Sequence, residues 1–350
     1  MRSHSRQIRL RAGALLLTAA ALFGTRLAHA QNLAPNELDY YLVQAFEAPR
    51  AEQRIALNHI GIAVQADAQG YLVAAALEAY PAHEAGLQRG DRILRVDGDA
   101  YHPIYSFNSS DSSGGFTPKL REYRIEYQRA GAEMSTVVTP VFENLYDSYR
   151  SATLNSSLAF PLGNKRVAYV RLWGLSRGTA DLFSLELLMD EFARSDGLIV
   201  DLRNAYGYLS QKHLDLFVRD GRGDFETSDL SNRQTDIEGS YPLSTARPFS
   251  KPIVVLMNDE TRGGAELLAY GLSKLGRIIT MGEASAGEIG HYEQRGGALQ
   301  YQSGSAPLID GQPFESIGIA PSAPVAYPIN ESSRSDPQFE SAIDYLLGRI

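Results

Sequence analysis

The sequence contains no cysteine and has fewer basic than acidic residues. Without cysteine the chain cannot form a disulfide, present a thiolate nucleophile or carry an acylated cysteine as a membrane tether. Its 33 lysine and arginine residues stand against 41 aspartate and glutamate residues, a net charge of −8. This balance argues against nucleic acid as a partner. Because no disulfide can form, the folded state must be stabilised by a hydrophobic core.

Long apolar runs are also scarce, and the clearest one covers residues 12–23. It follows an arginine-rich start and precedes the small residues of Ala28-His29-Ala30, as in a secretory signal peptide. A membrane-spanning helix needs roughly 20 apolar residues, so a membrane anchor is the weaker interpretation. We predict that residues 1–30 are a signal peptide cleaved after Ala30 and that the mature protein is periplasmic or secreted, with no transmembrane segment. Loss of the five arginines in residues 1–30 leaves 28 basic against 41 acidic residues, a net charge of −13.

Hydrophobic periodicity changes part-way along the chain. Short strands separated by turns predict a small, mainly-β domain over residues 57–142, preceded by a helical segment over 31–56. Beyond Gly163, strands alternate with longer amphipathic stretches, which predicts an α/β domain over 143–350. One such helix is expected to begin at about Gly264. Apolar runs without alternation in this part indicate a sheet that is covered on both faces.

Residues 82–98 read AHEAGLQRGDRILRVDG, which resembles the helix-to-strand signature of bacterial PDZ domains. The resemblance implies a module that adds an extended chain end as a strand and captures its carboxylate, so the expected partners are peptides or unfolded protein C-termini. His59, Ile60, Gly61 and Ile62 stand where the carboxylate-binding loop of that family falls. An ordinary strand with a solvated His59 is the alternative.

Three later segments carry a second resemblance. They are GLIVDLRN at 197–204, KPIVVLMN at 251–258 followed by a helix with Glu266, and Gly282-Glu283. Their order and spacing resemble the carboxyl-terminal processing, or tail-specific, serine peptidases. The resemblance implies a ClpP/crotonase-like α/β core with no cofactor and no metal.

The resemblance also locates the catalytic positions of that family. Its serine lies three residues before the glutamate, its base lysine 25 residues after the serine, and an assisting glutamine four residues further. These positions hold Gly263, Glu288 and Tyr292 in this chain. Glycine has no attacking atom and a glutamate carries the opposite charge to lysine, so the family mechanism would lose on the order of 10⁶ in kcat.

The expected cleft departs from the family in its glycine-rich turn as well. That turn reads Ala205-Tyr206-Gly207-Tyr208, and we expect Tyr206, Gly207, Tyr208 and Gly264 to border the cleft. For the tyrosines, core packing is the alternative to ligand contact. Residues 261–266 and 282–287 are more similar to the branch of interphotoreceptor retinoid-binding protein, whose serine also falls on Gly263.

These observations favour a peptide-binding protein that is catalytically degenerate, although whether it is an enzyme stays open. One alternative is an active serine endopeptidase that uses relocated residues, for which Ser285 and His291 are the nearest pair in sequence. The other is a carrier of a small apolar ligand.

We predict that protein purified from its native host begins at Gln31, because residues 1–30 have the charge, apolar run and small residues that signal peptidase requires. Intact-mass measurement and N-terminal sequencing check this. A mature chain that retains residues 12–23 would contradict both the signal peptide and the exported location.

Overall fold

The computed structural model describes residues 32–109, 115–217, 248–303, 308–309, 312–329 and 335–350. The predicted signal peptide, residues 1–30, lies outside this part. Among the described residues, no helix combines the length and the apolar character that crossing a membrane requires.

The first sheet is antiparallel, with the order β2-β3-β4-β6-β7 and β5 beside β4. Its strands are β2 (Ile62–Asp67), β3 (Gly70–Ala76), β4 (Arg92–Val96), β5 (Asp99–Ala100), β6 (Tyr123–Arg129) and β7 (Ala132–Val138). The short helix α2 (Pro81–Glu84) follows β3, and β1 (Leu57–His59) pairs with β8 (Val141–Glu143) where the chain enters and leaves. Val73, Ile93 and Ile125 lie in its core. Strand β2 is an edge of the sheet.

The second sheet has the order β20-β15-β14-β12-β10-β9, and all its pairs are parallel except β9 with β10. Its strands are β9 (Leu158–Leu162), β10 (Lys165–Arg171), β12 (Gly197–Asp201), β14 (Ile253–Met257), β15 (Ile278–Gly282) and β20 (Ala323–Pro324). Every residue of β12 and β14 is buried, as their unalternating apolar sequence predicts. The predicted α/β core is therefore confirmed.

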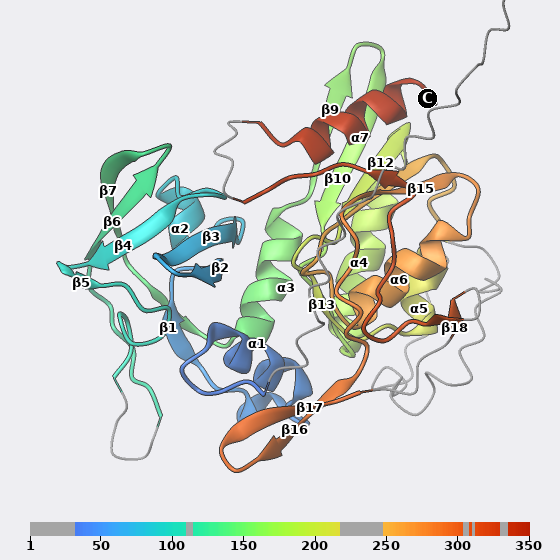
Figure 1. Cartoon of the computed structure of the whole chain (residues 1–350). Coiled ribbons are helices and arrows are strands. Elements are labelled where there is room, and N and C mark those ends of the chain that lie inside the picture. Colours follow the sequence, from blue (N-terminus) through green and yellow to red (C-terminus); the bar gives the residue numbers. More distant parts are fainter. Residues whose placement is uncertain (1–31, 110–114, 218–247, 304–307, 310–311, 330–334) are drawn as a thin grey trace, which may run out of the picture.

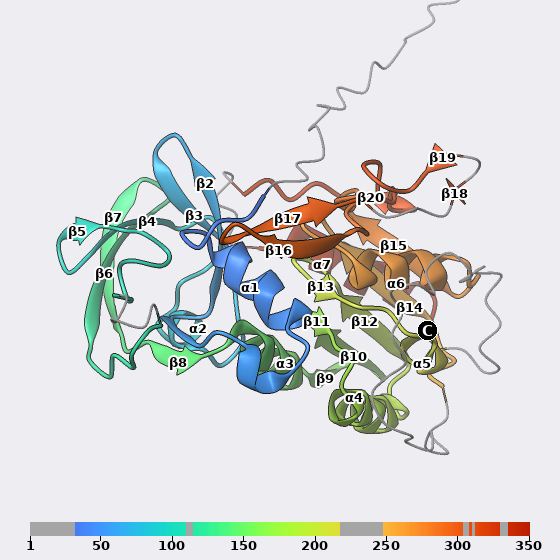
Figure 2. The same cartoon turned by 90° about the horizontal axis from the view of Figure 1, so that it is seen from below.

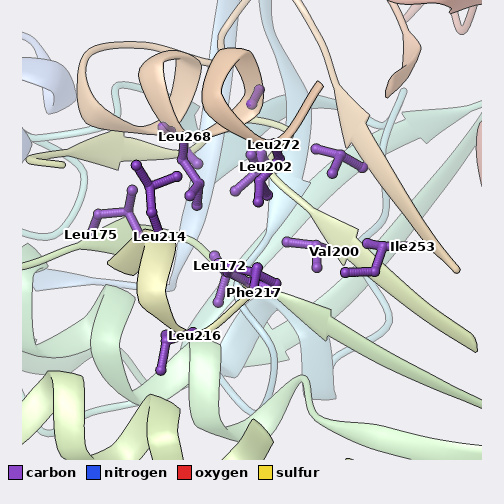
Figure 3. Close-up of a cluster of buried hydrophobic side chains, with 14 of the residues drawn as sticks. Leu172, Leu175, Val200, Leu202, Leu214, Leu216, Phe217, Ile253, Leu268 and Leu272 are labelled. Atoms are coloured by element: carbon purple, nitrogen blue, oxygen red, sulfur yellow. The ribbon is translucent and has the colours of Figure 1, made fainter. Parts of the chain in front are cut away.

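Helices cover both faces of this sheet. The helices are α3 (Leu145–Asn155), α4 (Thr179–Phe192), α5 (Gln211–Asp215), α6 (Gly264–Ser273) and α7 (Pro337–Leu347). Leu268 and Leu272 of α6 meet Val200 and Ile253 of the strands in one buried cluster (Figure 3). On the opposite face, Ala342 and Leu346 of α7 pack on strand residues of a second cluster. Figure 1 shows the two sheets side by side, with α3 between them.

A further hydrophobic cluster joins the N-terminal helix to the α/β core. Helix α1 (Leu38–Glu47) lies beside the hairpin of β16 (His291–Arg295) and β17 (Ala298–Gln302) (Figure 2). The Leu33 amide donates a 2.8 Å hydrogen bond to the Leu299 carbonyl, so the segment before α1 is tied to the hairpin. The remaining short elements are η1 (Ala51–Gln53), the pair β11 (Gly174–Leu175) and β13 (Tyr206–Gly207), and the pair β18 (Leu308–Ile309) and β19 (Gln312–Pro313).

Candidate functional site

The N-terminus of α6 lies at the carboxyl end of β14. The connection is shaped by Asn258, whose amide donates to the Thr261 hydroxyl at 3.0 Å, while the Thr261 amide donates to the Asn258 carbonyl at 2.9 Å. Gly263 then caps the helix with φ 61° and ψ −128°. Residues with a side chain rarely adopt this conformation, so the backbone itself favours glycine here.

Close packing adds a second reason for glycine at positions 263 and 264. A Cβ atom at position 263 would lie 2.9 Å from the Gly207 carbonyl oxygen. A Cβ atom at position 264 would lie 2.3 Å from the Leu209 amide nitrogen. Both contacts are with backbone atoms, which cannot move aside as a flexible side chain would. The chain at 206–209 therefore occupies the space into which a nucleophilic side chain at 263 would project.

Glu266 ties the start of α6 to the loop that carries Glu288. Its carboxylate is fully buried and accepts hydrogen bonds from the amides of Gly263 at 3.2 Å, Gly287 at 2.8 Å and Glu288 at 2.7 Å. The Gly263 amide also donates to the Glu288 carbonyl at 3.0 Å. Burial raises the pKa of Glu266 to about 7, against the opposing effect of its hydrogen bonds. The Glu266 carboxylate is therefore occupied by hydrogen bonds from backbone amides.

The Glu288 carboxylate faces an arginine. Its Oε2 lies 4.0 Å from Nη1 of Arg262, and the same Nη1 lies 3.1 Å from Oδ2 of Asp39 in α1. Burial alone would lower the pKa of Arg262, but Asp39, Glu260 and Glu288 together hold it well above its usual value. Burial also raises the pKa of Glu260 to about 7. The positive charge of Arg262 thus compensates the negative charge of Glu288, the residue that we predict at the base position.

The tyrosines of the expected cleft pack in the hydrophobic cluster beneath α1. Tyr206 is 6% exposed, and its ring meets Phe46 edge-to-face with centroids 5.5 Å apart. Tyr292 is 7% exposed and meets Tyr301 edge-to-face at 5.1 Å. The guanidinium of Arg177 lies 4.1 Å from the centre of the Tyr208 ring. These contacts agree with the core-packing interpretation of Tyr206 and Tyr208, of which Tyr208 is only partly buried, and Tyr292 packs in the same cluster.

The segment from His59 to Ile62 differs from the expectation of a solvated histidine. His59 is 3% exposed, and its Nδ1 accepts a 3.1 Å hydrogen bond from the Gly61 amide. Ile60 is buried, and its carbonyl accepts from the Ala82 amide at 2.9 Å. Burial lowers the pKa of His59 to about 4, so the ring is neutral at pH 7. The solvated alternative is therefore wrong.

His59 also belongs to a serine–histidine–carboxylate set that the sequence does not reveal. Its Nε2 lies 3.1 Å from the Ser148 hydroxyl, which donates to Glu143 at 2.7 Å. Because Nδ1 of the neutral ring accepts a hydrogen bond from the Gly61 amide, the ring proton is on Nε2. The Nε2–H group therefore donates a hydrogen bond to the Ser148 hydroxyl. A catalytic histidine would instead accept the serine proton. Ser148 is fully buried as well, so this set is structural.

Ser285 and His291, the possible relocated pair, form hydrogen bonds with different partners. The Ser285 hydroxyl accepts from the Ile319 amide at 2.8 Å and hydrogen bonds to Glu266. His291 Nε2 lies 3.3 Å from Oε1 of Glu293. Within the described part of the chain, no group of three or more histidine, aspartate or glutamate residues could hold a metal ion.

Two residues of this site escaped the sequence analysis, Arg262 and Asp39. A usable signal for Arg262 is its position directly before Gly263, at the start of an otherwise apolar helix. Asp39 had no such signal, because it stands 223 positions away from the arginine that it pairs with.

Comparison with known proteins relates part of the chain to a peptidase family. Residues 166–325 match the sequence pattern of Peptidase family S41. This part of the chain is therefore similar to the S41 peptidases. The S41 segment includes β10, β12, β14, α6 and β15, together with positions 263, 288 and 292.

Processing proteases are among the proteins to which this chain is similar. It is 28% identical over 290 residues to a carboxyl-terminal-processing protease of Synechocystis sp. and 22% identical over 297 residues to the carboxy-terminal processing protease CtpA of Bacillus subtilis. These matches cover 79% and 81% of this chain but only 65% and 59% of those proteins. A solved structure of a Bacteroides fragilis protein assigned to the S41 proteases shares the fold, with a TM-score of 0.51, 15% identity and 83% of each chain covered.

We predict that Gly263→Ala and Gly264→Ala each destabilise the mature protein by about 1–3 kcal/mol, because the new Cβ atoms meet backbone atoms at 2.9 and 2.3 Å. Gly276→Ala is the matched control, since a Cβ atom there has no neighbour within 4 Å. Denaturant unfolding measures the three differences. If all three variants matched the wild type, the close approach of residues 206–209 to α6 would be wrong.

Proposed function

We propose that this protein is exported, binds extended or C-terminal peptides, and does not hydrolyse them by the mechanism of the S41 peptidases. The observation that carries the proposal is the geometry of Gly263. The residue has no nucleophile, and the Gly207 carbonyl lies 2.9 Å from the place where a side chain would begin. Loss of a serine nucleophile costs on the order of 10⁶ in kcat.

The neighbouring groups support the same conclusion. A lysine base must be desolvated to lose its proton at neutral pH, whereas position 288 holds a carboxylate 4.0 Å from Arg262. Position 292 holds a tyrosine that packs against Tyr301. The nucleophile, the base and the group that orients the base are thus all replaced, each by a residue with a structural role.

The peptide-binding part of the proposal rests on residues 57–142, which we assign as a PDZ-like module before an S41 domain at 143–350. Strand β2 is an edge of the first sheet, and its residues after Ile62 are half-buried or exposed. An extended peptide can add to such an edge through backbone hydrogen bonds. The Gly61 amide, which donates to neutral His59, is the group that we assign to the peptide carboxylate. The carboxylate would replace the His59 nitrogen as acceptor.

The processing proteases among the relatives support an extended chain end as the ligand, since they are named for action at carboxyl termini. An active peptidase with relocated residues is less well supported, because Ser285 and His291 have other partners. A carrier of apolar ligands is also less well supported, because Tyr206 and Tyr292 are packed in the cluster beneath α1.

We predict that the mature protein binds peptides with a free carboxyl terminus, with a dissociation constant on the order of micromolar, or about −8 kcal/mol. Calorimetric titration should compare each peptide with its amidated copy and with a copy whose backbone is N-methylated. Amidation should weaken binding because it removes the carboxylate charge, and N-methylation should abolish it because strand addition needs backbone N–H groups. Equal binding of acid and amide would exclude the carboxylate pocket, and full binding of the N-methylated copy would exclude strand addition.

We predict that the mature wild-type protein leaves unfolded casein intact and that the Gly263→Ser/Glu288→Lys double variant recovers only a trace of activity. The new serine meets the Gly207 carbonyl, and Tyr292 cannot orient the new lysine as the family glutamine would. Such groups act as a unit, so restoring two of them restores little. Casein degradation is followed by gel and mass spectrometry. Wild-type turnover that survives Gly263→Ala but is lost in Ser285→Ala would overturn the proposal in favour of a relocated nucleophile.

A further inference from the structure

A polar cavity of about 130 Å³ lies between the first sheet and the α/β core. Its floor is the carboxyl edge of the parallel strands, where Arg171 ends β10, Arg203 and Asn204 follow β12, and Asn258 follows β14. Its opposite wall is formed by Ala74–76 of β3 and by Arg89. Figure 1 shows β3 on the side of the first sheet that faces the core. Open α/β sheets commonly bind ligands at this edge.

Two arginines of the cavity, Arg89 and Arg171, form no ion pair within 4 Å among the described residues, although the charges of Glu283 and Asp259 act on Arg89 and that of Asp201 lies near Arg171. Arg89 donates through its Nη atoms to the carbonyls of Ala74 at 3.0 Å and Tyr327 at 2.8 Å. Arg171 donates through Nη2 to the Arg203 carbonyl at 3.2 Å and stacks on Trp173. In both, the Nε atom is buried and has no hydrogen-bond acceptor. A buried N–H donor without an acceptor is costly unless a ligand or a water molecule supplies one.

The other charged side chains that line the cavity are Arg203, Asp336 and Glu283. Arg203 pairs with Asp201 at 2.5 Å and with Asp336 at 2.7 Å. Glu283 also lines the cavity, and burial raises the pKa of its carboxyl. Arg89 and Arg171 therefore provide the positive charge that a ligand would meet.

The backbone at the cavity is strained as well. Asn204 has a φ of 60°, in the left-handed region. The conformation is fixed by Asn258, whose side-chain oxygen accepts from the Asn204 amide at 2.9 Å and whose side-chain nitrogen donates to the Asn204 side chain at 3.3 Å. Strain of this kind that neighbouring groups hold in place is typical of binding sites.

We propose that this cavity binds a small oxyanion, a carboxylate or a phosphate, between the guanidinium groups of Arg89 and Arg171. The N–H donors of a guanidinium group match the arrangement of the oxygen atoms in a planar carboxylate or a tetrahedral phosphate. A water molecule takes about 30 Å³ in the liquid, so the cavity has room for about four waters or for one small oxyanion with a water. The site is separate from position 263 and does not depend on the proposed function.

The experiment titrates the mature protein with sodium phosphate and, separately, with sodium acetate, at constant ionic strength set with sodium chloride. We expect a saturable rise in the unfolding temperature and broadening of the phosphate ³¹P resonance, which acetate reverses if both anions share the site. Binding of one anion alone would support the proposal and identify the oxygen geometry. An effect no larger than that of chloride would overturn it.

The protein variants locate the site. Arg89→Gln/Arg171→Gln should weaken anion binding at least tenfold, whereas Arg295→Gln, which changes an exposed arginine of β16, should leave it unchanged. Unchanged binding by the double variant would overturn the assignment to this cavity. If the double variant does not fold, the single changes Arg89→Lys and Arg171→Lys retain the charge but not the Nε donor, and binding equal to wild type in both would contradict the proposal.

Discussion

The hydrogen bonds of the Glu266 carboxylate hold the candidate site together. A single buried side chain accepts from the amides of Gly263, Gly287 and Glu288, so it connects the first turn of α6 to the loop that follows β15. Gly263 and Glu288, which we predict to stand at the nucleophile and base positions of processing peptidases, are therefore held together by Glu266. The scaffold of the site does not require the catalytic side chains.

A close backbone approach adds the second constraint. Residues 206–209 run directly against the start of α6, and only glycine at 263 and 264 leaves room for them. Tyr206 is then covered by Phe46 of α1, and Arg262 reaches Asp39 of the same helix. The N-terminal helix, the tyrosines and the glycines thus form one packed unit.

Electrostatics explain why Glu288 is tolerated beside a buried helix start. Taking a carboxylate out of water is costly unless it is paired. Arg262 supplies the charge, and it is shared with Asp39 and Glu260. A lysine at 288 would face this arginine instead of a hydroxyl, and the repulsion would disfavour it.

Sequence alone determined the α/β core, because β14 is apolar throughout, β12 is apolar up to its last residue, and helix patterns follow them. It also predicted that Gly263, Glu288 and Tyr292 stand at the catalytic positions of processing peptidases, since counting from Glu266 needs only the chain order. Tertiary structure alone decided that residues 206–209 close on Gly263, that His59 is buried against Ser148, and that Arg89 and Arg171 line one cavity. These contacts join residues up to 89 positions apart or in different sheets. No local pattern encodes which distant segment will supply a neighbour, because that choice depends on how the whole core packs.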